Sequence, residues 1–298
     1  MSLSLILGPG ALGRLLALRL AEQAPVTLIG RRPLPPRQAL TTPEGETLDR
    51  ELDCRTTATL TRALAGEAEC LHLTTKAYAA EAALAAVADR LRPDLPLVLW
   101  QNGFGVQQVL AERWTGPVLC ATTTEGAFLA GDDGVVHAGH GRTLIGALDG
   151  RHGSLAERLA DRLTAAGLPA TPVEDIRVRL WHKLAVNAAI NPLVARFRIR
   201  NGQLRDRPFR PMVEAVIEEV AAIMAAEHIP APEGGWDCLV WTVVSATGNN
   251  RASMLQDVLA GRPTEHAAIL GPLLAAGRRH GLATPTLAAL HARFDGST

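Results

Sequence analysis

Three polar side chains recur at four-residue spacing between Leu180 and Leu193, and they are the clearest candidates for chemistry in the sequence. Lys183, Asn187 and Asn191 would lie along one face of a single helix. Burying a lysine and two amides on an otherwise apolar helix is costly unless they bind something. Because Asn both donates and accepts hydrogen bonds, these amides suit a ligand with hydroxyl and carboxylate groups. The pattern alone leaves a second interpretation open, an internal polar seam with satisfied hydrogen bonds.

Glu265 is the second candidate, at the end of a segment that starts at Ser253. Thr264 resembles an N-cap, which places Glu265 in the first turn of the next helix. A carboxylate in that position commonly offsets the helix dipole. If Lys183 lies nearby, Glu265 would instead hold the ammonium in place and keep it charged enough to donate a proton. Both roles stay open at the level of sequence.

A glycine-rich segment at residues 8–13 follows the apolar run Leu3 to Leu7 and opens a helix-like stretch, Leu12 to Gln23. The order strand, glycine turn, helix is the one that the pyrophosphate of a dinucleotide needs, because the helix N-terminus presents free N–H groups to the anion. A glycine turn that binds nothing is the alternative. The completed strand–helix–strand unit of residues 1–30 favours the dinucleotide.

Within this segment each glycine has its own task. The first permits the tight turn, the second lets the backbone approach the phosphates, and the third lets the helix pack closely on the strand. Proline has no N–H to donate, so we expect the phosphate donors among the amides that follow it. The candidate cofactor-binding residues here are Gly8, Pro9, Gly10, Ala11, Leu12 and Gly13.

The end of the second strand indicates which dinucleotide binds. An acidic residue there would accept a hydrogen bond from the ribose 2′-OH of NAD. The chain instead continues from Val26–Ile29 to Gly30, Arg31 and Arg32. Guanidinium groups at this position can clamp a 2′-phosphate, so the sequence predicts NADP (NADPH). Two points stay open: which arginine takes the phosphate, and whether both are merely solvated loop charges.

Composition agrees with an enzyme that acts on small molecules. The 298 residues are 47% hydrophobic, and 30 basic side chains balance 30 acidic ones. A net charge of zero gives no electrostatic footprint for nucleic acid or an anionic membrane. No apolar run approaches the roughly twenty residues that span a bilayer, and the N-terminus has no basic region typical of a signal peptide. We expect a cytoplasmic protein, with neither a nucleic-acid partner nor a membrane.

The four cysteines are scattered without a C-x-x-C spacing. This spacing predicts neither a disulfide framework nor a structural zinc site, and it places the chain in a reducing compartment. We therefore expect no metal among the site residues.

Two domains are expected. Strand and helix patterns alternate through the first half, which predicts an α/β, Rossmann-type, doubly wound parallel sheet, with an antiparallel addition at the later strands. Beyond about residue 175 the strand signals vanish and helical periodicity continues to the end. We expect an NADP-binding domain over residues 1–172 and an all-helical substrate domain over residues 173–298. Periodicity predicts a helix over Ile176 to Ala189. Pro192 disfavours helical geometry at Asn191, and a kink there would aim that amide into a pocket.

Taken together, the motifs resemble those of the ketopantoate reductase (2-dehydropantoate 2-reductase) family. The resemblance covers nearly the whole chain, in matching order, although residues 229–250 match no motif. It is carried by the glycine segment, Thr74-Thr75-Lys76, Gln101-Asn102-Gly103, Thr122-Thr123-Thr124, Leu180 to Leu193, Asn201 to Arg205, and Ser253 to Glu265.

The resemblance implies a role for each site residue. Lys183 would be the proton donor and Glu265 a carboxylate that positions the lysine and faces the cofactor. Arg31 and Lys76 would meet the phosphate end of NADP, and Gly126 would offer backbone to the nicotinamide. The implied substrate contacts are Lys183, Asn187, Asn191, Asn201 and Ser253, with Asn102 touching both substrate and cofactor.

The function that the resemblance implies is the NADPH-dependent reduction of 2-dehydropantoate to (R)-pantoate, a step in pantothenate and coenzyme A biosynthesis. One alternative is a reductase of another branched 2-oxo acid. Another is an NADPH-sensing protein that keeps the fold without turnover. The expected partner is a small 2-oxo acid, and the chain is expected to be a monomer or a homodimer.

Overall fold

The computed structural model describes residues 3–295. Its contacts divide the chain into two compact units. The first comprises the residues up to 101 together with 106–177, and the second comprises 102–105 together with the residues from 178 onward. The expected domain boundary between residues 172 and 173 stays a prediction.

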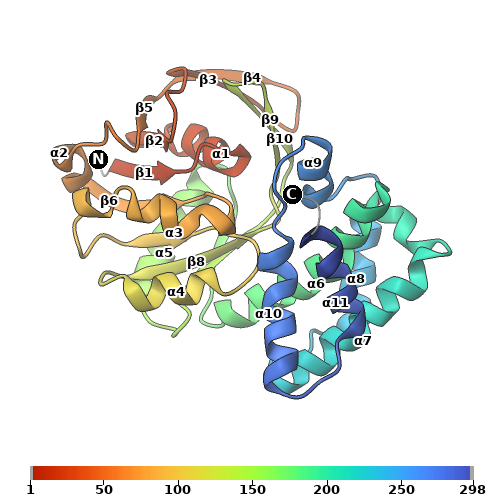
Figure 1. Ribbon diagram of the computed structural model, residues 1–298. Helices are drawn as coiled ribbons and strands as arrows, with labels where there is room; N and C mark the ends of the chain where they lie inside the picture. Colours follow the sequence, from red (N-terminus) through yellow and green to blue (C-terminus); the bar gives the residue numbers. More distant parts are fainter. Residues whose placement is uncertain (1–2, 296–298) are drawn as a thin grey trace. The chain divides into compact units, whose positions relative to one another are not determined.

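The first unit is built on an eight-stranded sheet with the order β12-β11-β8-β7-β6-β1-β2-β5 (Figure 1). All neighbours are parallel except β11 and β8, which are antiparallel. This arrangement confirms the expected α/β fold, including the late antiparallel strand. The strands are β1 (Leu3–Leu7), β2 (Val26–Gly30), β5 (Asp53–Thr56), β6 (Ala68–Leu73), β7 (Leu97–Leu99), β8 (Val118–Thr123), β11 (Thr143–Gly146) and β12 (Ala170–Pro172).

Helices connect these strands in the predicted alternating order, except between β2 and β5 and between β8 and β11, where strands of a second sheet intervene. The central strands are wholly buried, as β1 and β2 show, because helices cover a parallel sheet on its faces. The helical segments of this unit are α1 (Ala11–Leu20), α2 (Arg62–Gly66), α3 (Ala77–Ala85), the 3₁₀ turn η1 (Ala88–Arg90), α4 (Val106–Arg113) and α5 (Gly153–Ala165).

A second sheet, with the order β4-β3-β10-β9, packs on α1. Its strands are β3 (Arg37–Thr41), β4 (Thr47–Glu51), β9 (Gly126–Ala130) and β10 (Gly134–Gly139). Strands β3, β4 and β9 were not predicted from the sequence. Only alternate residues of β3 are buried and none of β4 is, so the apolar signal in this hairpin is weak.

One buried polar chain ties this second sheet to α1. His137 Nε2 and Glu125 Oε2 are 2.7 Å apart, and the side chains are only 0% and 2% exposed. Glu125 also accepts a hydrogen bond from the Gly141 amide at 2.8 Å, while Arg19 of α1 lies 3.4 Å from the other nitrogen of His137. Because Glu125 directly precedes Gly126, this chain fixes the start of β9.

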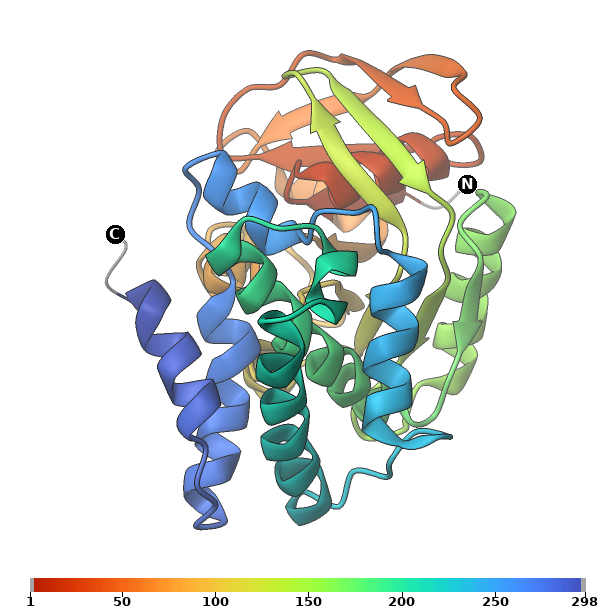
Figure 2. The same ribbon diagram turned by 90° about the vertical axis from the view of Figure 1, so that its right-hand side faces the viewer.

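The second unit is helical throughout its described part, as expected (Figure 2). Helices α10 and α11 pack side by side, and α7 contacts both of them. The elements are α6 (Ile176–Phe197), the 3₁₀ turn η2 (Asn201–Arg205), α7 (Phe209–Ala226), α8 (Gly235–Ala246), α9 (Ser253–Leu259), α10 (His266–Arg279) and α11 (Pro285–Asp295).

Two local predictions are wrong. Helix α6 continues through Pro192 to Phe197, beyond the expected end at Ala189. Ile190, Leu193 and Val194 around the proline are buried apolar side chains, and their packing outweighs the hydrogen bond that proline removes. Helix α10 begins at His266, so Glu265 occupies the N-cap position and does not lie in the first turn.

Within residues 3–295, no helix is long and apolar enough to cross a membrane.

The buried contact between Glu125 and His137 should contribute far more to stability than the exposed contact between Glu44 and His140, although both join a carboxylate to an imidazole. Replacing Glu125 by Ala leaves His137 and the Gly141 amide without their partner, so we expect the free energy of unfolding to fall by about 3 kcal/mol. Glu44 makes the same 2.7 Å contact with His140 at an exposed position and is the matched control. Glu44→Ala is expected to leave stability unchanged. Urea denaturation of both variants measures this, and equal losses would contradict the prediction.

Candidate functional site

The glycine segment in the first unit has the close packing expected of a phosphate-binding turn. Gly8 has φ +117°, and a Cβ there would lie 2.7 Å from the Thr75 nitrogen. A Cβ on Gly13 would lie 2.0 Å from the Gly8 oxygen. A Cβ on Gly10 would meet nothing within 4 Å. The backbone is therefore crowded on its inner side at Gly8 and Gly13, and open at Gly10, where a pyrophosphate would approach.

Side chains outside the motif hold this turn from within. The Thr74 hydroxyl donates to the Gly8 carbonyl at 2.7 Å, and Arg14 Nε donates to the Pro9 carbonyl at 3.0 Å. Arg14 also donates to the Gln38 side chain, and burial lowers the pKa of its guanidinium. No side chain caps α1 at Gly10, which leaves the first amides of the helix, at Ala11 and Leu12, available to an anion.

Arg14 was not among the candidate residues predicted from the sequence. A charged residue on the buried face of a helix, four positions after Gly10, was the signal that could have found it.

The two arginines after β2 have different surroundings. Arg32 forms an ion pair with Asp132 at 3.0 Å in the turn between β9 and β10. Arg31 is exposed, and no hydrogen bond or ion pair of its side chain occurs within residues 3–295. Lys76 occupies the N-cap position of α3, and Gly126 is the first residue of β9.

In the second unit, Lys183 and Glu265 form an electrostatic pair. Burial lowers the pKa of the Lys183 ammonium to about 8, and the charge of Glu265 opposes this shift. Glu265 is only 5% exposed, which is typical of a carboxylate that is paired with another protein group. At pH 7, a lysine with a pKa near 8 is about nine-tenths protonated and can still release its proton readily.

Residues 102–105 belong to this helical unit, although their neighbours on both sides belong to the first. Gly103 has φ +83°, and a Cβ there would lie 2.2 Å from the Ala268 oxygen of α10. The Phe104 amide donates to the same oxygen at 3.2 Å, and its ring lies 5.0 Å from that of Trp181. This close approach places the Asn102 amide nitrogen 3.5 Å from Glu265 Oε2.

The amides of α6 meet no protein partner. Within the described residues, no hydrogen bond involves the side chain of Asn187 or Asn191. Asn191 is buried and Asn187 is half-buried. An internal polar seam would require partners for these groups, so the observation favours the ligand-binding interpretation over the seam.

Asn201 lies in the turn after α6 and is also incompletely paired. Its side-chain nitrogen donates to Thr247 at 2.9 Å, while its buried side-chain oxygen has no partner among the residues that the structure describes. The backbone is held by the Gly202 amide, which donates to the Gly248 carbonyl at 2.9 Å. Residues 247–250, which matched no motif, thus form the support of Asn201.

A short connection joins Ser253 to Glu265. Ser253 is exposed at the first position of α9. Asp257, which is buried, accepts hydrogen bonds from the side chain of Arg262 at 3.0 Å and, through its carbonyl, from the Arg262 amide at 2.9 Å. Both residues lie within the segment Ser253 to Glu265, for which the sequence predicted no such contact. They close the loop that delivers Glu265 to the N-terminus of α10.

Each unit therefore carries one group of candidates. The first gathers the glycine turn and a cationic strand end, which suit the phosphates of a dinucleotide. The second gathers a lysine that can donate a proton, its carboxylate partner, and amides without protein partners, which suit a small anionic ligand with hydroxyl groups. This combination matches a reductase of a small carbonyl compound.

Comparison with known proteins gives the same result. Residues 4–150 match the family model described as ketopantoate reductase PanE/ApbA, and residues 175–296 match its C-terminal counterpart. The 2-dehydropantoate 2-reductase of Vibrio cholerae is 37% identical over 290 residues, covering 96% of this chain and 94% of the relative.

Solved structures share the fold. A ketopantoate reductase of Ralstonia eutropha has a TM-score of 0.86 at 24% identity, covering 99% of this chain and 98% of that one. A D-mandelate dehydrogenase solved with NADH and anilino(oxo)acetate has a TM-score of 0.88 at 22% identity, with the same coverage. With family models that match both units and a relative that matches almost end to end, the chain belongs to the ketopantoate reductase family.

Proposed function

We propose that this chain reduces 2-dehydropantoate to (R)-pantoate with NADPH, and so acts as an oxidoreductase in pantothenate and coenzyme A biosynthesis. The observation that carries the proposal is the half-buried Lys183, whose pKa desolvation lowers to about 8, beside the carboxylate of Glu265. Curated relatives named 2-dehydropantoate 2-reductase, 37% and 38% identical to this chain, support the substrate.

The first unit fits the cofactor. We assign the pyrophosphate to the amides that begin α1, because the backbone is open at Gly10 and no side chain caps the helix. We assign the 2′-phosphate to Arg31, because Arg32 is paired with Asp132. Lys76 and Gly126 are further contacts by resemblance. When bound, NADPH supplies the hydride.

The second unit would provide the proton and the orientation. Lys183 Nζ holds a proton that it gives to the ketone oxygen of the substrate as negative charge develops there. Glu265 keeps that ammonium charged, and Asn102 donates to Glu265. Asn187 and Asn191, whose amides have no protein partner within residues 3–295, would bind the carboxylate and hydroxyl of the substrate and so fix the reacting carbonyl. The unpaired oxygen of Asn201 and the hydroxyl of Ser253 would complete these contacts.

Two alternatives have distinct signatures. A reductase of another branched 2-oxo acid would keep every residue of the proton-donating pair but turn over a different substrate faster. An NADPH-sensing protein would bind the cofactor without turnover, and it would have no need for a lysine whose pKa is poised near neutral pH.

The test is a steady-state assay of NADPH oxidation with 2-dehydropantoate and a panel of 2-oxo acids. We expect the highest kcat/KM with 2-dehydropantoate. General acid catalysis is worth about 10² to 10⁴ in rate, so Lys183→Ala should lower kcat by that factor while NADPH affinity stays the same. Higher kcat/KM with another acid would favour the first alternative. NADPH binding without oxidation by any acid would favour the sensor.

The shifted lysine also predicts a pH dependence. The protonated form is the donor, so the rate of reduction should be full below pH 8 and fall as the pH rises through the pKa of about 8. Because Glu265 raises this pKa, Glu265→Gln should move the midpoint of the profile to lower pH. Glu227→Gln is the control, since Glu227 pairs with Arg279 and His280 and does not act on Lys183. An unchanged midpoint in Glu265→Gln would remove the pair from the mechanism.

The different surroundings of the two arginines predict the origin of cofactor preference. A charge-assisted hydrogen bond contributes roughly 1.5–3 kcal/mol, so the chain should favour NADPH over NADH by about ten- to a hundredfold or more. Arg31→Ala should erase most of that ratio by weakening NADPH binding alone. Arg32→Ala is the matched control and should change the ratio less, because Arg32 is paired with Asp132. Dissociation constants at low and high salt measure this, and equal affinity of the wild-type chain for both cofactors would contradict it.

A further inference from the structure

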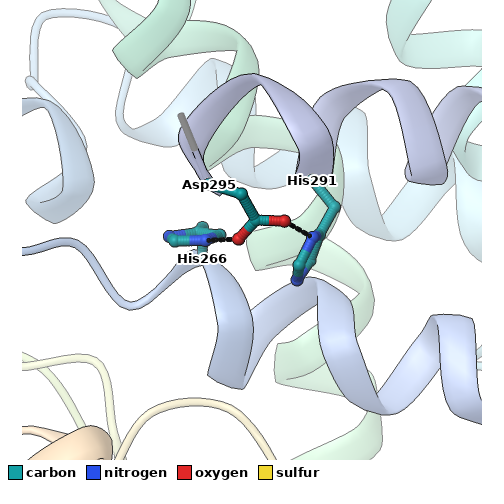
Figure 3. Close-up of side chains that lie close together, drawn as sticks. All are labelled: His266, His291 and Asp295. Atoms are coloured by element: carbon teal, nitrogen blue, oxygen red, sulfur yellow. Dashed lines mark hydrogen bonds and ion pairs between the residues drawn. The ribbon is translucent and has the colours of Figure 1, made fainter. Parts of the chain in front are cut away.

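Three side chains outside the proposed active site come together where α10 begins and α11 ends (Figure 3). His266 Nε2 lies 3.0 Å from Asp295 Oδ1, and His291 Nδ1 lies 2.8 Å from Asp295 Oδ2. The carboxylate therefore sits between two imidazoles, one from each helix. His291 and Asp295 are four residues apart on α11, which places them on one face of that helix.

The surrounding residues hold His266 in place. The Thr264 hydroxyl lies 2.9 Å from His266 Nδ1, and the Phe294 ring stacks on the imidazole with a centroid distance of 5.7 Å. The His266 and His291 rings meet edge to face at 5.1 Å. Both imidazoles are mostly buried, with side chains 15% and 23% exposed, whereas Asp295 is 56% exposed. The cluster is thus built from ordered rings and remains open to solvent on the carboxylate side.

We propose that His266, His291 and Asp295 bind a divalent transition-metal ion of the zinc class. Imidazole nitrogen and carboxylate oxygen are ligands of zinc, whereas magnesium and calcium require oxygen ligands. The donor atoms of the three residues all lie within 4.8 Å of one another. Neighbouring ligands of a tetrahedral zinc ion are about 3.3 Å apart, because each lies about 2.0–2.1 Å from the metal. The nitrogen–oxygen distances of 3.0 and 2.8 Å are already close to that value.

The proton inventory permits this exchange. In the metal-free cluster each neutral imidazole donates its N–H to Asp295. When an ion binds, each ring keeps its proton but carries it on its other nitrogen. The proton of His266 moves from Nε2 to Nδ1, where the Thr264 hydroxyl can accept it, and that of His291 moves from Nδ1 to Nε2. Thr264 then stabilises the ligating tautomer from behind. Three protein ligands leave the fourth tetrahedral position to water.

The site would join the last turn of α11 to the first residue of α10, which follows Glu265 directly. It is independent of the proposed reaction, since none of its three residues belongs to the proton-donating pair. The sequence predicted no metal because the cysteines lack a C-x-x-C spacing. Cysteine spacing says nothing about the histidines and the aspartate of this site, which come together only when α10 packs on α11.

The test is a titration of the tag-free, EDTA-treated full chain with zinc sulfate, followed calorimetrically, with cobalt(II) absorption as a second readout of nitrogen and oxygen ligands. We expect one high-affinity ion per chain. His291→Ala and the conservative Asp295→Asn should each weaken zinc binding at least about tenfold, because even outer partners of metal ligands are worth that much. Magnesium should not compete for the site.

Two matched controls separate this site from adventitious binding. His280→Ala removes a histidine at the other end of α10 that lies 2.9 Å from the Glu227 carboxylate but has no second imidazole, so zinc affinity should be unchanged. Cys238→Ser removes an exposed thiol and should likewise have no effect. Melting curves of the metal-free variants establish that they are folded. No zinc binding by the wild-type chain, or equal affinity in Asp295→Asn, would show that the three residues form a hydrogen-bonded clamp only.

Discussion

The desolvated ammonium of Lys183 is the constraint around which the helical unit is organised. Burial favours the neutral amine, and Glu265 opposes that effect, so the pKa settles near 8. A lysine left alone in such surroundings would lose its proton and with it the ability to serve as an acid. A fully solvated lysine would hold its proton too tightly near neutral pH. A pKa between these two limits requires that the carboxylate of Glu265 stay close to Lys183. Contacts from α9, α10 and residues 102–105 hold it there.

Two features place Glu265. From one side, the Asp257–Arg262 contact closes the loop after α9 and ends it at the N-cap of α10. From the other side, Gly103 lets the backbone approach Ala268 on the first turns of α10, and Asn102 then donates to the carboxylate. Only glycine fits at residue 103, because its φ is positive and a Cβ would overlap the Ala268 oxygen. Residues 102–105 thus belong to the helical unit because they contact α10 and place a hydrogen-bond donor, Asn102, at Glu265.

Much of this could be predicted from sequence where the signal is local. The glycine turn, the parallel strands and the shared face of Lys183, Asn187 and Asn191 all follow from spacing within one or two elements. The contacts that position them could not be predicted. Arg14 meets Gln38, Asn102 meets Glu265, and Asn201 meets Thr247 across 24, 163 and 46 residues of sequence, and nothing in the local pattern marks the partners. The predicted end of this helix at Ala189 was wrong for the same reason, since tertiary packing of α6 outweighs a local preference.

Under the proposed function, the unpaired amides also bear on which 2-oxo acid the site prefers. Asn187 and Asn191 have no protein partner within residues 3–295, and the buried oxygen of Asn201 has none either. A ligand whose hydroxyl pairs with these amides gains hydrogen bonds. A ligand of similar shape without the hydroxyl removes water from the amides and leaves them unpaired. Sites built to pair a substrate hydroxyl reject the analogue that lacks it far more strongly than an apolar pocket rejects a missing methylene. 2-Dehydropantoate carries such a hydroxyl and a simple branched 2-oxo acid does not, so the unsatisfied amides themselves argue for the hydroxylated substrate.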